Sequence, residues 1–186
     1  MDEKTLYKLK YPIGEFEKPS SITTTQREMW INSIQSFPEG IKQLTDGLSI
    51  VQLNWPYRPD GWTIKQVVHH CADSHMNSLM RFKLALTEDS PEIRPYHEDR
   101  WAQLIDSQDD DLSYTLMLLE GLHYRLVSVI KNLSKTDLQR EFVHPEHGKR
   151  FTLEETIGTY AWHSEHHLAH IQQALNAGGK FSPANP

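Results

Sequence analysis

The stretch Tyr160–Ile171, "YAWHSEHHLAHI", combines a helical repeat of apolar residues with four histidines in eight positions. Successive residues of an α-helix are about 100° apart, so side chains three and four positions apart share one face. Counted from Ile157, one stripe roughly 80° wide collects the small and apolar residues of this segment. The stripe predicts an amphipathic helix packed against other helices, and it consists of Ala161, Ser164, Leu168, Ile171 and Leu175.

The same periodicity recurs upstream, where three more long segments carry apolar residues at helical spacing. Thr63 is a predicted N-cap for the second of these segments, and Thr152 with Glu155 forms a predicted capping box for the last helix. Gly178 is expected to end that last helix. Pro38 falls inside the first segment and is expected to kink or break it. The three upstream helices are predicted near residues 24–44, 63–86 and 110–132.

Little of the remaining sequence is predicted to be regular. Pro12, Gly14 and Pro19 indicate an extended N-terminal arm over residues 1–22. A short helical turn is expected around residues 101–105, and the "VHPEHGKRF" segment predicts a loop or small hairpin. Almost no strand alternation is present, so the fold class is all-α. We therefore predict a single four-helix-bundle domain over residues 1–186, with a C-terminal tail at residues 177–186.

Composition narrows the class of protein and its partners. The chain has 186 residues, a net charge of −6 and a single cysteine, so no disulfide can form within it. The acidic balance argues against nucleic acid and anionic membranes as partners. No apolar run approaches the ~20 residues of a membrane span, and the charged N-terminus lacks a secretory signal. These features predict a cytoplasmic protein that acts on a small molecule.

The histidines of the opening stretch form two i, i+4 pairs, the spacing at which two imidazoles can reach one metal ion. His163 and His167 lie at about 240° and about 280° from Ile157, beside the apolar stripe. His166 and His170 lie at about 180° and about 220° and mostly face away. Only the first pair borders the bundle interior, where a third ligand from another helix could join it. We therefore predict that His163 and His167 bind a metal.

The second helix offers His69, His70 and His75 as the third ligand. Counted from Ile64, His70 lies at about 240°, on a core flank, and His75 lies at about 20°, the most buried position. Periodicity alone does not choose between these two. A three-histidine set leaves at least one coordination position open, as in catalytic rather than structural zinc sites.

The other histidines are predicted to be ordinary hydrogen-bonded core residues or solvated surface residues. A zincin-type protease is excluded because its H-E-x-x-H motif places glutamate next to the first histidine. Here Glu165 is displaced by one position and lies at about 80°, on the opposite side of the helix from His163. The sequence identifies no general base. The histidines assigned to this ordinary group are His69, His123, His144, His147, His166 and His170.

Three blocks in this order, "GWTIKQVVHHCADSHMNS", "RPYHEDRWAQL" and "YAWHSEHHLAHI", resemble the DinB/YfiT-like family of metalloenzymes. The similarity is greatest to its YfiT branch of metal-dependent hydrolases, and it covers most of the chain. The resemblance implies a four-helix bundle with one divalent ion on three histidines. The family's helix-two ligand directly precedes an L-A-D triplet, which corresponds here to Cys71-Ala72-Asp73, so the resemblance selects His70.

The resemblance also implies the cofactor, the partners and the activity. Zinc is the expected occupant and nickel the alternative, and members of the branch are expected to be homodimers. A metal-dependent hydrolase of a small molecule is the leading prediction. A thiol S-transferase acting with bacillithiol or a similar low-molecular-weight thiol is the second, and a non-catalytic bundle stabilised by metal is the third. Asp73 and Ser74, one turn after His70, are candidates for orienting a ligand ring.

Overall fold

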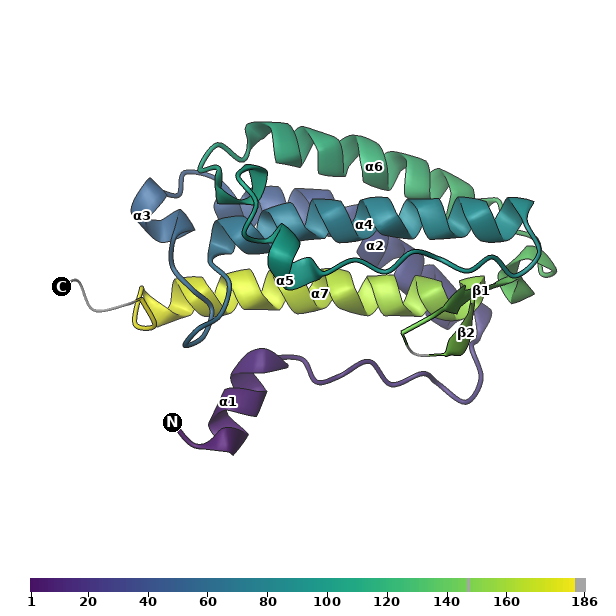
Figure 1. Ribbon diagram of the computed structural model, residues 1–186, viewed down its shortest axis with the longest axis horizontal. Helices are drawn as coiled ribbons and strands as arrows, with labels where there is room; N and C mark the ends of the chain where they lie inside the picture. Colours follow the sequence, from purple (N-terminus) through teal and green to yellow (C-terminus); the bar gives the residue numbers. More distant parts are fainter. Residues whose placement is uncertain (147, 183–186) are drawn as a thin grey trace.

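Four long helices form the body of the protein in the computed structural model, which describes residues 1–146 and 148–182 (Figure 1). They lie side by side as a bundle, in which α2 and α4 each pack against both α6 and α7. The predicted all-α class and four-helix bundle are confirmed. The four helices are α2 (Thr24–Thr45), α4 (Ile64–Thr87), α6 (Ser113–Lys131) and α7 (Leu153–Ala177).

Short elements connect the long helices. β1 (Glu141–His144) and β2 (Lys149–Thr152) pair antiparallel, which confirms the small hairpin expected before the last helix. The short α-helix in the connector between α4 and α6 is α5, which ends at Trp101, where the turn expected at residues 101–105 was predicted to begin. The short helical elements are α1 (Glu3–Lys10), α3 (Ile50–Leu53), α5 (Glu98–Trp101), η1 (Asp106–Gln108) and η2 (Asp137–Gln139).

Threonine side chains begin three of the four long helices. Thr23, Thr63 and Thr152 each accept a hydrogen bond from the backbone N–H three residues ahead. At Thr63 the reciprocal bond from the Thr63 N–H to the Gln66 side chain completes a capping box. At Thr152 only half of the predicted capping box is present: Thr152 accepts from the Glu155 N–H, whereas the Glu155 carboxylate accepts a hydrogen bond from Lys18 at 2.8 Å.

The first ten residues and Pro38 correct two predictions. The arm is not extended throughout, because α1 occupies Glu3–Lys10, with Asp2 as an N-cap that accepts from Thr5 N–H. Residues 11–23 contain no helix or strand, as expected. Helix α2 continues through Pro38 without a break. Its neighbours Phe37 and Ile41 are fully buried, and this packing outweighs the hydrogen bond lost at proline.

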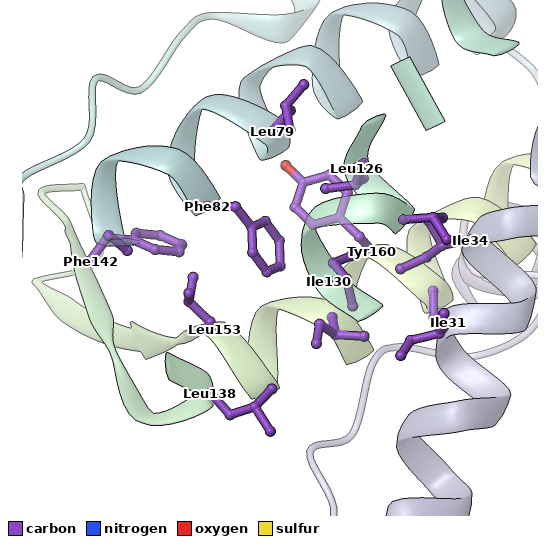
Figure 2. Close-up of a cluster of buried hydrophobic side chains, with 14 of the residues drawn as sticks. Ile31, Ile34, Leu79, Phe82, Leu126, Ile130, Leu138, Phe142, Leu153 and Tyr160 are labelled. Carbon is purple, nitrogen blue, oxygen red and sulfur yellow. The ribbon is translucent and has the colours of Figure 1, made fainter. Parts of the chain in front are cut away.

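Two apolar clusters fill the bundle, one toward each end. Figure 2 shows the cluster near the hairpin, where Phe82, Phe142 and Leu153 pack beside Leu138. The other cluster lies toward α3 and contains Phe37, Ile41 and Val68. Along α4, α6 and α7, buried histidines occupy the positions where one cluster gives way to the other. The bundle therefore has a polar layer between two apolar ends.

The N-terminal arm runs alongside α7 (Figure 1). Trp162 Nε1 donates to the Gly14 carbonyl at 3.0 Å, and Gln173 Nε2 donates to the Leu9 carbonyl at 2.9 Å. Gly178 adopts a left-handed conformation with φ 58° and caps the end of α7. Residues 183–186 of the predicted tail lie outside the described residues. No helix in the described residues is long and apolar enough to cross a membrane.

Candidate metal centre

The structure brings together the three histidines singled out by sequence. His70 comes from α4, and His163 and His167 come from successive turns of α7. One ring nitrogen from each lies within 4.8 Å of the other two, and the Nε2 atoms of His70 and His163 are 3.3 Å apart. The i, i+4 spacing on α7 and the α4–α7 contact thus place three nitrogen donors around one point.

Burial keeps these imidazoles neutral. Desolvation, followed by the nearby His166, lowers the pKa of His70 to about 4. Desolvation also lowers the pKa values of His163 and His167, with neighbouring histidines adding to the effect. At neutral pH each ring therefore keeps a lone pair on one nitrogen, which is the form that binds a metal.

The spacing suits a divalent ion. Metal–nitrogen bonds of 2.0–2.1 Å with tetrahedral angles place two ligand nitrogens about 3.3 Å apart. The His70–His163 separation of 3.3 Å matches this value, and the third nitrogen, from His167, lies within 4.8 Å of both. Three imidazoles and no carboxylate form a donor set that zinc and nickel both accept. The residues therefore fit the metal that the sequence resemblance implies.

A cavity of about 570 Å³ adjoins the cluster, with His163 on its wall. Arg81 Nη1 donates to the Tyr160 hydroxyl at 3.4 Å, and that hydroxyl donates to the Ser74 carbonyl at 3.2 Å. These bonds fix a guanidinium and a phenol on the cavity wall. The wall also includes Tyr96, His97, Glu98, Asp99, Arg100 and His144.

Two polar neighbours on α4 were candidates for orienting a ligand. The Ser74 hydroxyl lies 3.3 Å from His163 Nε2, so it contacts the cluster. Asp73 is half-buried, and desolvation together with the Asp106 carboxylate raises its pKa to about 6. Its electrostatic neighbour is therefore on η1. Ser74 contacts the cluster at Nε2 of His163, whereas His75 contacts the other nitrogen of that ring.

His75 and His123 form a second group beneath the cluster. His75 Nε2 lies 2.9 Å from His163 Nδ1, and His75 Nδ1 lies 2.7 Å from His123 Nε2. His123 Nδ1 lies 2.7 Å from the Ile34 carbonyl oxygen. His75 is thus the most buried histidine of α4, as its angle indicates, while His70 supplies the nitrogen of the cluster. Sequence reasoning left His123 among the ordinary core histidines.

For the remaining histidines, the structure confirms some of the predicted surroundings and corrects others. His69 is a hydrogen-bonded core residue, as predicted, with Thr115 Oγ1 at 2.9 Å and the Asp109 carbonyl at 3.1 Å. His166 and His170 do not face solvent, because the N-terminal arm covers that side of α7 and both rings are buried. The prediction that these two side chains face solvent was wrong. His147 lies outside the described residues.

Glu165 points away from the three-histidine cluster. It is exposed and accepts a hydrogen bond from the Ser33 hydroxyl on α2. This position agrees with the angular argument that Glu165 and His163 lie on opposite faces of α7. The arrangement therefore differs from that of a zincin, in which the glutamate beside the first histidine activates water.

The fold and the site define an α-helical bundle protein with a cluster of three neutral histidines beside a cavity. The DinB superfamily matches residues 34–171, and the chain belongs to this family. The "Putative metal-dependent hydrolase YfiT" of Bacillus subtilis (strain 168) is 46% identical over 169 residues, which cover 91% of this chain and 95% of that protein.

Further relatives agree in length and fold. The "Putative metal-dependent hydrolase OB0782" of Oceanobacillus iheyensis is 48% identical over 162 residues, covering 87% of this chain and 93% of that protein. The solved structure of YfiT from Bacillus subtilis is 45% identical, covers 92% of this chain and 98% of its own, and superposes with a TM-score of 0.89. That protein is described as "a probable metal-dependent hydrolase with an unusual four-helix bundle topology".

Proposed function

We propose that this protein is a metal-dependent hydrolase of a small molecule, with one divalent ion bound by His70, His163 and His167. The observation that carries the proposal is the convergence of three neutral imidazoles within 4.8 Å of one another, one of which, His163, lines a cavity. Relatives described as metal-dependent hydrolases support the same reaction class. Zinc is the proposed ion and nickel the alternative.

The cavity has the size of a small-molecule site. Ligand pockets commonly span ≈ 300–1,000 Å³, and this one measures about 570 Å³. A divalent ion bound by the three histidines would supply Lewis acidity, polarising a substrate carbonyl or activating water. Three protein donors leave at least one coordination position for a reactant.

Residues of the wall supply binding and proton transfer. Arg81 is held by the Tyr160 hydroxyl, so its positive charge can orient a substrate oxygen. Glu98 is an exposed residue on the cavity wall, and partial desolvation followed by the Asp99 and Glu146 carboxylates raises its pKa toward the range suited to proton exchange. We therefore propose Glu98 as the proton-transfer group. Glu98→Gln is expected to lower kcat by about 10²–10⁴-fold while metal content stays unchanged.

The direct test measures metal content and hydrolysis together. Untagged protein is analysed for metals by mass spectrometry and then assayed against a panel of esters and amides. His163→Ala should lose the metal and the activity but remain folded, because a three-ligand catalytic site does not hold the bundle together. His69→Gln is the matched control, since this adjacent histidine bonds to Thr115 and not to the cluster. Retention of metal and turnover by His163→Ala would contradict the proposal.

The same preparation separates the two alternative functions. Metal-dependent conjugation of monochlorobimane to bacillithiol, with no ester or amide turnover, would identify a thiol S-transferase instead. Unfolding of the bundle when a chelator removes the ion would identify a structural metal. A folded, metal-free and inactive protein that regains hydrolysis with added zinc is the result expected for the hydrolase.

A further inference from the structure

Each of the two α7 histidines of the cluster continues into a chain of imidazoles that ends on a main-chain carbonyl. From His163 the chain passes through His75 and His123 to the Ile34 carbonyl, with contacts of 2.9, 2.7 and 2.7 Å. From His167 it passes through His170 to the Lys10 carbonyl, with contacts of 3.3 and 3.1 Å. All four long helices, together with the N-terminal arm, contribute to this network.

The terminal carbonyl decides where every proton of the first chain lies. A carbonyl oxygen only accepts, so His123 donates from Nδ1 to Ile34 and keeps a lone pair on Nε2. His75 must then donate from Nδ1 to His123, which leaves its own Nε2 as the acceptor. His163 therefore donates from Nδ1 to His75 and keeps its lone pair on Nε2, the atom 3.3 Å from His70 Nε2.

The second chain gives the same result from the other side of α7. His170 donates from Nε2 to the Lys10 carbonyl and keeps a lone pair on Nδ1. His167 then donates from Nδ1 to His170, so Nε2 of His167 keeps its lone pair. Both chains thus leave the same nitrogen, Nε2, available on the two α7 histidines.

We propose that His75, His123 and His170 are positioning residues, which fix the tautomer and ring orientation of His163 and His167 for metal binding. This inference rests on the proposed metal site. Groups that hydrogen-bond the second nitrogen of a ligating histidine usually raise metal affinity by 10–100-fold. A carboxylate commonly accepts this hydrogen bond from a ligating histidine. Here neutral imidazoles accept it, so the site gains no negative charge.

Packing keeps the first chain rigid and dry. His75 and His123 are 1% and 2% exposed, and Phe37 lies against both rings with centroid distances of 5.0 and 5.1 Å. Because both rings are almost fully buried, each nitrogen depends mainly on its protein partner. On the second chain, Tyr57 stacks on the His170 ring at 3.8 Å. A rotated ring would break two hydrogen bonds without replacement.

The tautomers can be read without any substitution. In metal-free protein with ¹⁵N-labelled histidine, long-range ¹H–¹⁵N correlation spectra distinguish Nδ1–H from Nε2–H rings. We expect Nδ1–H at His75, His123, His163 and His167, and Nε2–H at His170. Imidazole in water favours Nε2–H, so four Nδ1–H rings are a specific signature. Nε2–H or averaging tautomers at His163 and His167 would overturn the proposal.

Two variants at one position separate positioning from packing. Glutamine has one donor and one acceptor, as neutral imidazole does, so His123→Gln can still link His75 to the Ile34 carbonyl. His123→Leu fills the site but removes the link. We expect His123→Leu to weaken Co²⁺ and Zn²⁺ binding by about 10–100-fold and to mix the His163 tautomers. His123→Gln should stay within about threefold of the parent chain.

Affinity is measured by competition with a chelating dye, after circular dichroism has shown that each variant is folded. Equal losses in both variants with an unchanged His163 tautomer would assign His123 to packing and overturn the proposal. If His123→Leu does not fold, the spectra of the unsubstituted protein still decide the question. Failure of the hydrolase proposal is distinguishable, because tautomers and Co²⁺ affinity are measured without a substrate.

Discussion

His166 is a buried histidine whose replacement should stabilise the protein. Its ring is 6% exposed, stacks on Trp162 at 4.5 Å, and has an Nδ1 atom with no hydrogen-bond partner among the described residues. His166→Phe keeps the stacking and removes the unsatisfied nitrogen, so the free energy of unfolding should rise by about 1 kcal/mol at pH 7. Urea unfolding followed by circular dichroism measures this change, and a lower stability would contradict it.

The metal-free protein should lose stability as the pH falls from 6.5 toward 4. Desolvation lowers the pKa of His70 and His123 to about 4, that of His166 to about 4 and that of His170 to about 3. The unfolded chain, whose histidines have a pKa near 6.5, therefore binds protons first, and each such group costs about 1.4 kcal/mol per pH unit. Half-buried Asp73, with a pKa of about 6, opposes this trend more weakly.

Free energies of unfolding measured at pH 7, 6 and 5, at constant ionic strength, test whether stability falls with pH. In His166→Phe one titrating group is absent, so its advantage over the parent chain should grow by roughly 2 kcal/mol between pH 6.5 and pH 5. Equal stability of the parent chain at pH 7 and pH 5 would show that the buried histidines do not titrate as their surroundings indicate.

Single residues also show how far the site can be predicted from sequence. The rule of about 100° per residue was sufficient to place His163 and His167 beside the core stripe, because both lie on one helix. It could not choose between His70 and His75, since both rings contact His163 and differ only in the nitrogen they reach: His70 lies at Nε2 and His75 at Nδ1. His123 could not be connected to them, because the contact depends on the register of α6 against α4.

At the scale of the element, the contribution of the N-terminal cap of α4 to stability can be measured. Thr63 accepts from Gln66 N–H, and Gln66 Oε1 accepts from Thr63 N–H at 3.0 Å. Thr63→Ala removes the cap and should lower the free energy of unfolding by about 1 kcal/mol, which corresponds to a fall of roughly 2–4 °C in Tm. Thr63→Ser keeps the hydroxyl and is the control. Equal melting temperatures for the two variants would rule out a role for the cap in stability.

Elements were predictable where local chemistry determines them. The caps at Thr63 and Thr152 and the stop at Gly178 lie within a few residues of the bonds they make. Pro38 does not break α2, because Phe37 and Ile41 are buried beside it, and this burial is not visible in the local sequence. Helix α1 was missed because the prediction rested on Pro12, Gly14 and Pro19, which all follow the helix, and did not consider the cap at Asp2.

At the scale of the whole molecule, the arm changes the meaning of one face of α7. Periodicity places His166 and His170 toward solvent, and this would hold for a bundle of four helices alone. Here residues 1–22 cover that face, so both rings are buried and His170 Nε2 reaches the Lys10 carbonyl. Contacts between segments 160 residues apart cannot be derived from local pattern.

The homodimer stays a prediction, which sedimentation velocity at several concentrations tests.

Removal of the arm should therefore weaken the metal site from a distance. A chain lacking residues 1–22 keeps all four long helices. It loses the Lys10 carbonyl, which accepts the hydrogen bond from His170 Nε2–H. His170 can then change tautomer and stop accepting from His167, so Co²⁺ affinity should fall by about 10-fold. The comparison is made in a double-mutant cycle with His170→Leu, which removes the same link directly. If the arm acts through His170, its deletion should leave the affinity of His170→Leu unchanged, whereas an additional loss of about 10-fold would mean that the arm acts by another route.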